Sequence, residues 1–394
     1  MAYRPVSAVL LAAGEGTRMH SSRPKPLHRL CGRPMVLHVL DALAELPVRE
    51  VVVVVGHRGD WVTKTLSEHA PSTLALSFVE QAERLGTADA LAVGLTALSE
   101  ELVDADGDVV VLPGDTPLVR PATLVRLVRE HRLSEAAATL VTARVDDATG
   151  SDRVVRGKAG AVVRIDDPSV VSSAAARLGG GAEAGMAEDD GVADAGAGRA
   201  CTEVATTIHC FRLGVLAPAL RRIAAAGDPA EHRLTDVYEV LASAGYRVES
   251  VTVDDPMEAA GVNDRAQLAV AEAELRARIN DRWMRQGVTM WDPSRTYVDA
   301  GVELAPDVVL LPGVVLQGAC RIGSGAEIGP DCHLVDTVVG AGATVRQSSG
   351  VGAEVGAGAC VGPFACLSAG AAVADGAVVA AFVELGGPAP APAC

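Results

Sequence analysis

The stretch VSAVLLAAGEGTRMHSSRPKPLH, residues 6–28, joins a short apolar run to a basic loop that contains two glycines. The apolar run predicts a buried strand. Gly14 and Gly16 let the following backbone approach a ligand and point its N–H groups at phosphate oxygens. Arg18 and Lys25 add cations that can neutralise a polyphosphate. The loop lacks the third glycine of a dinucleotide-binding fingerprint and the Gly-Lys-Ser/Thr of a P-loop, so it predicts a phosphate site of another type, with a plain structural loop as the alternative.

The sequence beyond the loop alternates apolar runs with helical patterns. Five consecutive valines at 51–55 indicate a strand that is buried on both faces. Further strands are expected at 74–79, 109–112 and 138–143, and helices at 35–46, 61–68, 88–98 and 122–131. This alternation predicts an α/β fold with a Rossmann-like, mainly parallel sheet, whose ligands bind beyond the carboxyl ends of the strands.

A different period governs the C-terminal part. Aliphatic residues recur there at about every sixth position, which fits neither an amphipathic helix nor an alternating strand. With slips at Val339 and Val355, the set is Val298, Leu304, Leu310, Leu316, Ile322, Ile328, Leu334, Val339, Val345, Val351, Val355, Val361, Leu367, Val373, Val379 and Leu385. The pattern predicts a short left-handed parallel β-helix of hexapeptide repeats, with each aliphatic side chain stacked inside the prism.

These patterns divide the chain into parts. We expect an α/β domain over 1–263, a linker helix within 264–290, the β-helix over 291–387 and a disordered tail over 388–394. Residues 169–199 are rich in Ala, Gly, Ser and acidic residues, which predicts a flexible insertion.

The charge balance of the chain is acidic. A formal net charge of −16 disfavours broad binding to nucleic acid or to an anionic membrane, so any phosphate site must be local. The sequence shows no signal-peptide pattern and no stretch near the roughly 18 apolar residues of a membrane span. The eight cysteines lack zinc-type spacing and are expected to be reduced and mostly buried. We therefore predict a cytoplasmic protein without nucleic-acid or membrane partners.

Several segments carry a resemblance to a known family. They are LAAGEGTRMHSSRPKPLH, QAERLGTADA at 81–90, LPGDTPLV at 112–119, RLTDVYEV, GVNDRAQL and the hexapeptide repeats. In this order they resemble the bacterial bifunctional N-acetylglucosamine-1-phosphate uridylyltransferase/glucosamine-1-phosphate acetyltransferase family over nearly the whole chain. The resemblance implies a sugar-phosphate nucleotidyltransferase domain over 1–263. It also implies a Mg²⁺-dependent reaction of UTP with N-acetylglucosamine-1-phosphate, which gives pyrophosphate and UDP-N-acetylglucosamine, a peptidoglycan precursor.

The resemblance also implies roles for individual residues. Arg18 and Lys25 would be the catalytic pair that acts on the phosphates. Nucleotide contacts are implied for Leu11, Ala13, Gly14, Gly16, Lys25, Gln81, Gly86 and Thr87, the last three at uracil. Asp115 and Asn263 would share the magnesium ion, which prefers hard oxygen ligands and takes several of them from phosphate and water. Taken without the family, Asp115 fits a turn equally well and Asn263 fits a helix N-cap.

The sugar side departs from the family pattern at three positions. Asp152 stands in place of a glycine, Arg164 in place of a glutamate and Ala205 in place of an asparagine. Losing hydrogen-bond partners in such a site changes substrate selectivity strongly. Two alternatives therefore stay open, a uridylyltransferase for a different hexose-1-phosphate and a non-catalytic nucleotide-binding assembly protein.

The β-helix departs from the family pattern as well. Cys366 and Ser368 stand where the family has phosphate-binding arginines, and no histidine lies beyond His333. We therefore expect no acetyltransferase activity. The resemblance to prism-bearing relatives implies a homotrimer formed through the β-helix.

Overall fold

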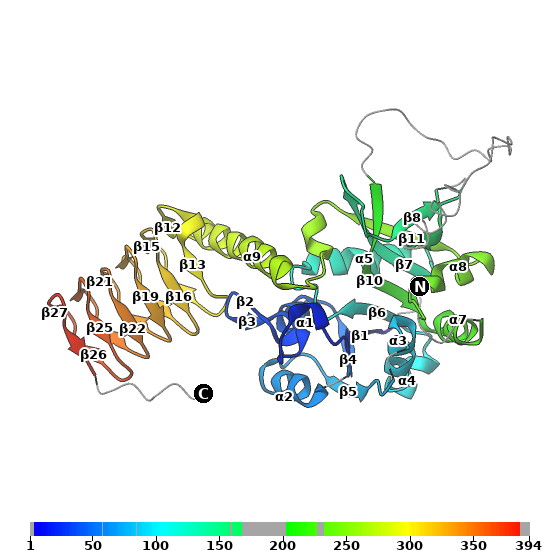
Figure 1. Ribbon diagram of the computed structural model, residues 1–394, viewed down its shortest axis with the longest axis horizontal. Coiled ribbons are helices and arrows are strands. Elements are labelled where there is room, and N and C mark those ends of the chain that lie inside the picture. The colour runs from blue at the N-terminus through cyan, green and yellow to red at the C-terminus, as the bar shows by residue number, and fades with distance from the viewer. Residues whose placement is uncertain are drawn as a thin grey trace. The chain divides into compact units, whose positions relative to one another are not determined.

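The computed structural model describes residues 4–56, 58–83, 85–157, 160–167, 202–226 and 232–386 (Figure 1). The chain divides into two compact units. Unit 1 comprises 1–27 and 35–264, and unit 2 comprises 28–34 and 265–394. The insertion expected at 169–199 and the tail expected at 388–394 lie outside the described residues.

Unit 1 is built on a mixed, mostly parallel sheet. Its central strands run in the order β11-β7-β10-β6-β1-β4-β5, and β10 is antiparallel to both of its neighbours, β6 and β7. The strands are β1 (Val6–Ala12), β4 (Val48–Val55), β5 (Leu76–Glu80), β6 (Asp108–Pro113), β7 (Ala138–Val145), β10 (Thr202–Arg212) and β11 (Val248–Val253), with β8 (Arg153–Arg156) and β9 (Val162–Asp166) joined to them through β10.

Helices cover both faces of this sheet (Figure 1). One face packs against α1 (Met35–Ala44), α2 (Gly59–His69) and α5 (Pro121–Leu133). The other packs against α3 (Thr87–Leu95), α4 (Glu100–Asp104), α7 (Leu213–Ala226) and α8 (Asp236–Ser243). The valines of β4 divide between the two cores: Val51, Val53 and Val55 face the first set of helices, and Val52 and Val54 face the second. This confirms the predicted sheet and the predicted burial of β4 on both faces.

The parallel strands gather several carboxyl ends at one edge of the sheet. β1 pairs in parallel with β4 and β6, and β5 extends the sheet beyond β4. The glycine loop follows β1, and Asp115 follows β6 by two residues. Gln81 directly follows β5, so three predicted site segments emerge at the same edge.

Unit 2 combines a hairpin, a long helix and the β-helix. The hairpin is formed by β2 (Arg29–Leu30) and β3 (Arg33–Pro34), and the helix is α9 (Arg265–Arg285). The side chain of Asn280 on α9 donates to the carbonyl oxygens of Pro293 and Thr296, both at 2.9 Å, which ties the helix to the first coil of the prism. A short 3-10 helix lies at Pro293–Arg295 in unit 2, and unit 1 contains three more at Thr17–Met19, Lys25–Leu27 and Pro256–Ala259.

The prism consists of three parallel sheets of short strands. The first sheet contains β12 (Thr289–Met290), β15 (Val309–Leu310), β18 (Glu327–Ile328), β21 (Thr344–Val345), β24 (Cys360–Val361) and β27 (Val378–Val379). The second contains β13 (Tyr297–Val298), β16 (Val315–Gln317), β19 (His333–Val335), β22 (Ser349–Val351), β25 (Cys366–Leu367) and β28 (Glu384–Leu385). The third contains β14 (Glu303–Leu304), β17 (Arg321–Ile322), β20 (Val338–Val339), β23 (Glu354–Val355) and β26 (Ala372–Val373). The predicted fold class is thereby confirmed.

One predicted inner position of the prism is wrong. Val351 is 51% exposed, and Gly350 takes the inner position of β22 instead. Gly350 pairs in register with Leu334 and Leu367, and a Cβ at 350 would come 3.1 Å from Leu334 Cδ2. The neighbouring leucines fill the interior there, so the inner position goes to the glycine and the valine points outward.

Candidate active site

Gly16 shapes the loop that follows β1. Its φ of 65° is left-handed, a conformation that glycine adopts without steric cost, and it precedes the 3-10 helix Thr17–Met19. A Cβ at position 16 would lie 2.6 Å from the Cβ of Lys25. Because glycine lacks that atom, Lys25 can pack directly against the loop at the start of the second 3-10 helix, Lys25–Leu27.

Three distant segments meet at Lys25. Its Nζ donates to Asn263 Oδ1 at 2.8 Å and forms an ion pair with the carboxylate of Asp115. The side chains of Lys25 and Asp115 are 12% and 21% exposed, so the cluster is shielded but still open to a ligand. The structure thus brings together the predicted catalytic lysine and both predicted metal ligands.

Backbone hydrogen bonds place Asp115 at the edge of the sheet. Gly114 N donates to Leu11 O at 2.9 Å and continues the pairing of β6 with β1. Val262 N donates to Asp115 O at 2.9 Å, which draws the segment containing Asn263 toward the loop after β6. The local sheet pairing therefore sets the spacing between the two oxygen-bearing side chains.

The other predicted residues of the loop lie at the same edge. Gly14 is exposed, and a Cβ there would meet no atom within 4 Å, which leaves open space beside its backbone. Ala13 runs close to Gly56, where a Cβ would come 2.6 Å from Ala13 O. Arg18 is exposed on the loop, and in the described part of the chain no hydrogen bond or ion pair joins it to the Lys25 cluster.

Gln81 is the first residue of the predicted base-binding segment. Its N donates to Val55 O at 2.9 Å and prolongs the pairing of β5 with β4. Its side chain is buried, and Nε2 donates to Asp89 Oδ2 at 2.7 Å and to Gly86 O at 3.3 Å. The loop between β5 and α3 is therefore closed by the amide of Gln81.

Gly86 and Thr87 contact the segment at 232–234. Ala88 N donates to His232 O at 2.9 Å, and Thr87 Oγ1 accepts from Leu234 N at 2.9 Å. A Cβ at Gly86 would lie 2.4 Å from His232 O, so only glycine permits this approach. The predicted base-binding segment is thus packed against the segment 232–234, which contains Arg233.

The sugar-side residues are only partly brought together. Asp152 O accepts from Ala205 N at 2.8 Å, so these two positions are neighbours. Arg233, which no sequence pattern singles out, pairs with Asp152 at 2.6 Å and with Asp167. Arg164 instead pairs with Asp166 at 2.7 Å, with its side chain 50% exposed.

Asp236, in the same motif as Arg233, has a pKa that is raised by its burial. The positive charge of Arg233 opposes that rise in pKa without cancelling it. Arg233 lies in the motif RLTDVYEV, but its partners are set by the fold. Because Asp152 and Asp167 lie far from this motif in the sequence, no local pattern indicates the cluster.

Comparison with known proteins identifies the family. Residues 8–151 match the model of the MobA-like NTP transferase domain. Proteins named bifunctional protein GlmU are similar over most of the chain. The one from Streptomyces avermitilis is 41% identical over 90% of this chain and 68% of its own length. The chain belongs to the GlmU family.

Other GlmU proteins agree with this assignment. The protein from Thermobifida fusca is 40% identical over 87% of this chain and 66% of its own length. The one from Brevibacillus brevis is 38% identical over 89% of this chain and 69% of its own length. The chain thus spans about two thirds of the length of these relatives. The predicted family and the predicted nucleotidyltransferase class are confirmed, with nucleotide and sugar-phosphate substrates and a general dependence on a divalent metal ion.

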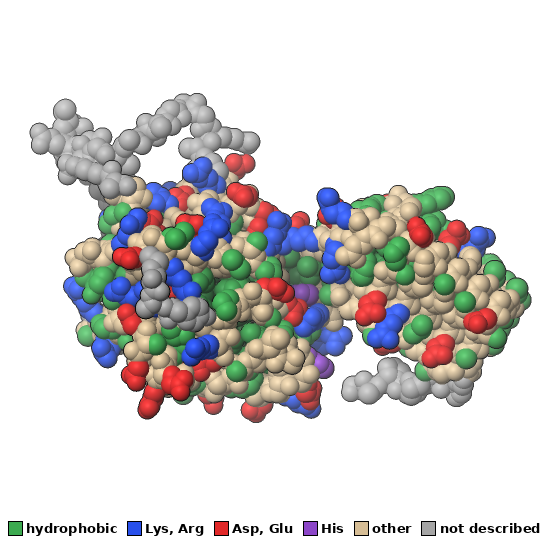
Figure 2. All heavy atoms as spheres, turned by 180° about the vertical axis from the view of Figure 1, so that it is seen from behind, with side chains coloured by type: hydrophobic (Ala, Val, Ile, Leu, Met, Phe, Trp, Pro, Cys, Tyr) green, Lys and Arg blue, Asp and Glu red, His purple; other side chains and the backbone are tan. Residues whose placement is uncertain are grey.

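The described residues include no membrane-spanning helix and no cluster of metal-binding side chains. None of their helices is long and apolar enough to cross a membrane. No group of three or more His, Cys, Asp or Glu side chains among them could hold a metal ion. Figure 2 shows acidic and basic side chains intermixed over the visible surface of unit 1.

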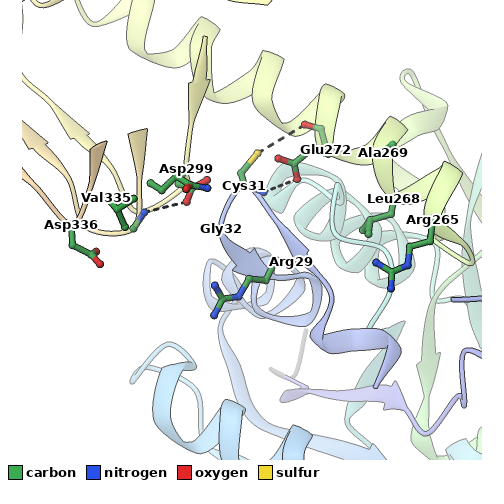
Figure 3. Close-up of a pocket in the computed structure, with 12 residues that line it drawn as sticks. Arg29, Cys31, Gly32, Arg265, Leu268, Ala269, Glu272, Asp299, Val335 and Asp336 are labelled. Atoms are coloured by element: carbon green, nitrogen blue, oxygen red, sulfur yellow. Dashed lines mark hydrogen bonds between the residues drawn. The ribbon is translucent and has the colours of Figure 1, made fainter. Parts of the chain in front are cut away.

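A separate cavity of about 580 Å³ lies within unit 2 (Figure 3). The hairpin, the first half of α9 and the β-helix line it, and the lining includes none of the predicted site residues. Its carboxylates are satisfied by backbone donors: Glu272 accepts from Cys31 N at 2.8 Å and Asp299 accepts from Gly318 N at 3.1 Å. Burial raises the pKa of the Cys31 thiol, so the thiol is not an activated nucleophile.

Proposed function

We propose that unit 1 transfers the uridylyl group of UTP to N-acetylglucosamine-1-phosphate and so forms UDP-N-acetylglucosamine and pyrophosphate. One observation carries the proposal: Asp115 and Asn263 converge on the Nζ of Lys25 at the carboxyl edge of the sheet. Membership of the GlmU family supports the same reaction.

The reaction requires positioning and charge neutralisation rather than a nucleophilic side chain. A phosphate oxygen of the sugar phosphate attacks the α-phosphorus of UTP, the bond from that phosphorus to the bridging oxygen breaks, and pyrophosphate leaves. Lys25 would neutralise charge on the phosphates, with Arg18 as a second cation from the loop surface. The backbone at Gly14 and Gly16 would bind phosphate oxygens beside the open space at Gly14.

The donor set at Lys25 fits Mg²⁺. Asp115 offers a carboxylate and Asn263 an amide oxygen, both hard ligands, and both already face one point. When bound, Mg²⁺ supplies positive charge to the phosphate oxygens. Asp115 and Asn263 would hold it, and Lys25 would turn toward the phosphates.

The base would occupy the pocket edge formed by Gln81, Gly86 and Thr87. Leu11 and Ala13 would contact the nucleotide from the end of β1. The close packing of Gly86 against His232 O supports a rigid wall for a planar ring. The segment at 232–234 then joins the base side to the sugar side.

A second candidate substrate is favoured by the Arg233 cluster. Asp152, Asp167 and Arg233 form charged pairs beside Ala205, where the resemblance implies sugar contacts. Two carboxylates and a guanidinium beside this position favour a hexose-1-phosphate with a different pattern of polar substituents.

Pyrophosphate release tests both candidates. The full chain is assayed with UTP, Mg²⁺ and a panel of hexose-1-phosphates. Turnover confined to N-acetylglucosamine-1-phosphate supports the first proposal, and turnover confined to another sugar supports the second. Binding of UTP without turnover on any sugar would overturn both and leave a non-catalytic nucleotide-binding protein.

We also propose that the β-helix forms a homotrimer. Apolar side chains are exposed along it, including Val351, Phe364 and Val378, and Figure 2 shows hydrophobic side chains on its visible face. Light scattering that gave the mass of a single chain would contradict this.

Neutral side chains at Cys366 and Ser368 support the further proposal that acetyl transfer is absent, which an assay with acetyl-CoA and glucosamine-1-phosphate would test.

A further inference from the structure

The orientation of the Gln81 amide is determined by its neighbours. Nε2 lies 2.7 Å from a carboxylate oxygen of Asp89 and 3.3 Å from the carbonyl oxygen of Gly86. Both neighbours only accept hydrogen bonds, so the end of the amide that faces them must be the donor. The two protons of Nε2 are therefore used within the protein, and Oε1 must point the other way.

Oε1 of Gln81 is left for a ligand. In the described part of the chain it makes no hydrogen bond to protein, and it is not among the buried polar atoms that lack a partner. Gln81 as a whole is only 7% exposed, so the small accessible part of its side chain includes this oxygen. The residue thus presents a single acceptor at the edge of the sheet where the nucleotide site lies.

Asp89 is placed by the helix rather than by the loop. It lies in the first turn of α3, whose N-terminus carries positive dipole character that favours an acid there. Because α3 is packed against β1 and β4, the carboxylate has a fixed position relative to the end of β5. It can therefore hold the Gln81 amide more firmly than the carbonyl of Gly86 does at the longer distance.

We propose that Asp89 is a positioning residue that sets base selectivity: it fixes Gln81 so that Oε1 accepts from the N3–H of a uracil-type base. This inference rests on the proposed binding of UTP at this site. Uracil carries a donor at N3 between two carbonyl groups, which matches a lone acceptor. Cytosine carries an acceptor at N3, so the same oxygen would face a lone pair and repel it.

Substitutions of Asp89 should change the discrimination between UTP and CTP. In Asp89→Leu the amide can rotate by half a turn and present Nε2 to the base, which suits cytosine as well as uracil. Discrimination between UTP and CTP in kcat/KM should fall by roughly tenfold to a hundredfold. Asp89→Asn keeps an acceptor in its side-chain oxygen and should keep most of the discrimination.

The change should appear in nucleotide binding rather than in the chemical step. Gln81 contacts the base, which is remote from the reacting phosphorus, so KM for UTP should rise in Asp89→Leu while kcat changes little. Asp60→Leu is the matched control, since Asp60 is an exposed acid in the first turn of α2. Its ratio of UTP to CTP turnover should equal that of the unmodified protein.

The measurement is steady-state pyrophosphate release with UTP and with CTP, together with equilibrium binding of both nucleotides to the full chain. Unchanged discrimination in a folded Asp89→Leu protein, with UTP turnover intact, would overturn the role of Asp89 and leave the proposed function standing. Equal losses in Asp89→Leu and Asp89→Asn would also overturn it. Failure of the unmodified protein to bind or turn over UTP would instead overturn the proposed function itself.

Discussion

Lys25 and Arg233 are two cations of unit 1 that are each held by a pair of oxygen-bearing side chains, and they differ in the charge of those partners. Lys25 has one carboxylate, Asp115, and one neutral amide, Asn263. Arg233 has two carboxylates, Asp152 and Asp167. The first cluster is neutral overall, whereas the second carries an excess negative charge.

The difference indicates which cation can change partners. A triphosphate would bring enough negative charge for Lys25 to leave Asp115, and a divalent cation could then take the place of the ammonium. Arg233 has no such reason to leave, because removing it would expose two carboxylates to each other. We therefore propose that Lys25 takes part in the chemical step and that Arg233 sets the charge of the proposed sugar side.

The largest effect is expected from Asp115→Ala. Loss of the carboxylate removes a proposed metal ligand and a partner of Lys25, so pyrophosphate release should fall by about a thousandfold, or roughly 4 kcal/mol of transition-state stabilisation. A chelator should have a similar effect on the unmodified protein. Asp104→Ala, an exposed acid on α4, is the control. Activity within tenfold of normal in Asp115→Ala would remove Asp115 from the catalytic cluster.

Lys25→Met should follow in size. It retains the apolar stem that packs against Gly16 but removes the charge, so kcat should fall by about a hundredfold while the fold is kept. Lys64→Met on α2 is the matched control, because Lys64 is exposed. A change in KM for UTP with normal kcat would show that Lys25 only binds the nucleotide.

Much of unit 1 follows from local patterns. The run of valines in β4 predicts a strand with two buried faces because neighbouring side chains alternate between the two helix layers. The prism is equally periodic, yet its period predicts Val351 at the inner position that Gly350 occupies. A glycine gives no hydrophobic signal, so a shortened repeat around it is invisible until the neighbouring coils are stacked.

In the candidate site, too, some residues can be predicted from sequence motifs and others only from the structure. Lys25, Asp115 and Asn263 were selected from motifs, and the structure brings them together although Lys25 and Asn263 are 238 residues apart. Arg233 and Asp89 lie within quoted motifs but were not selected. The partners of Arg233 lie far away in the sequence, whereas Asp89 bonds to Gln81 in its own motif, a side-chain contact that the motif alone does not indicate.

His209 contrasts with Lys25 and Arg233 because its pKa is shifted by burial alone and not by an ion pair. His209 shares a hydrogen bond of 2.7 Å with the hydroxyl of Tyr238, and burial lowers its pKa to about 3. In the unfolded chain the imidazole binds a proton near pH 6.5, whereas in the folded chain it stays neutral down to about pH 3. The free energy of unfolding therefore decreases as the pH falls from about 6.5 toward 3. At pH 5 the loss from this group should be about 2 kcal/mol.

Denaturant unfolding at pH 8 and pH 5 measures this effect. His209→Phe should lower the difference in unfolding free energy between the two pH values by about 2 kcal/mol, whatever its stability at pH 8. His69→Gln, at an exposed site on α2, should leave the difference unchanged. An equal pH dependence in His209→Phe and the unmodified protein would mean that His209 is not held neutral by the fold.

The smallest effect is expected from Arg233→Leu. Asp152 and Asp167 would then repel each other and the phosphate of the sugar substrate, so KM for the sugar phosphate should rise by roughly tenfold while KM for UTP stays constant. Adding Asp152→Asn should recover part of the loss, because it removes one of the two uncompensated charges. Arg129→Leu serves as control, since this arginine is 63% exposed on α5 and pairs with the adjacent Glu130. If KM for UTP rose as much as KM for the sugar phosphate, Arg233 would have to act through the neighbouring base segment at Thr87. The proposed difference in role between Lys25 and Arg233 would then be wrong.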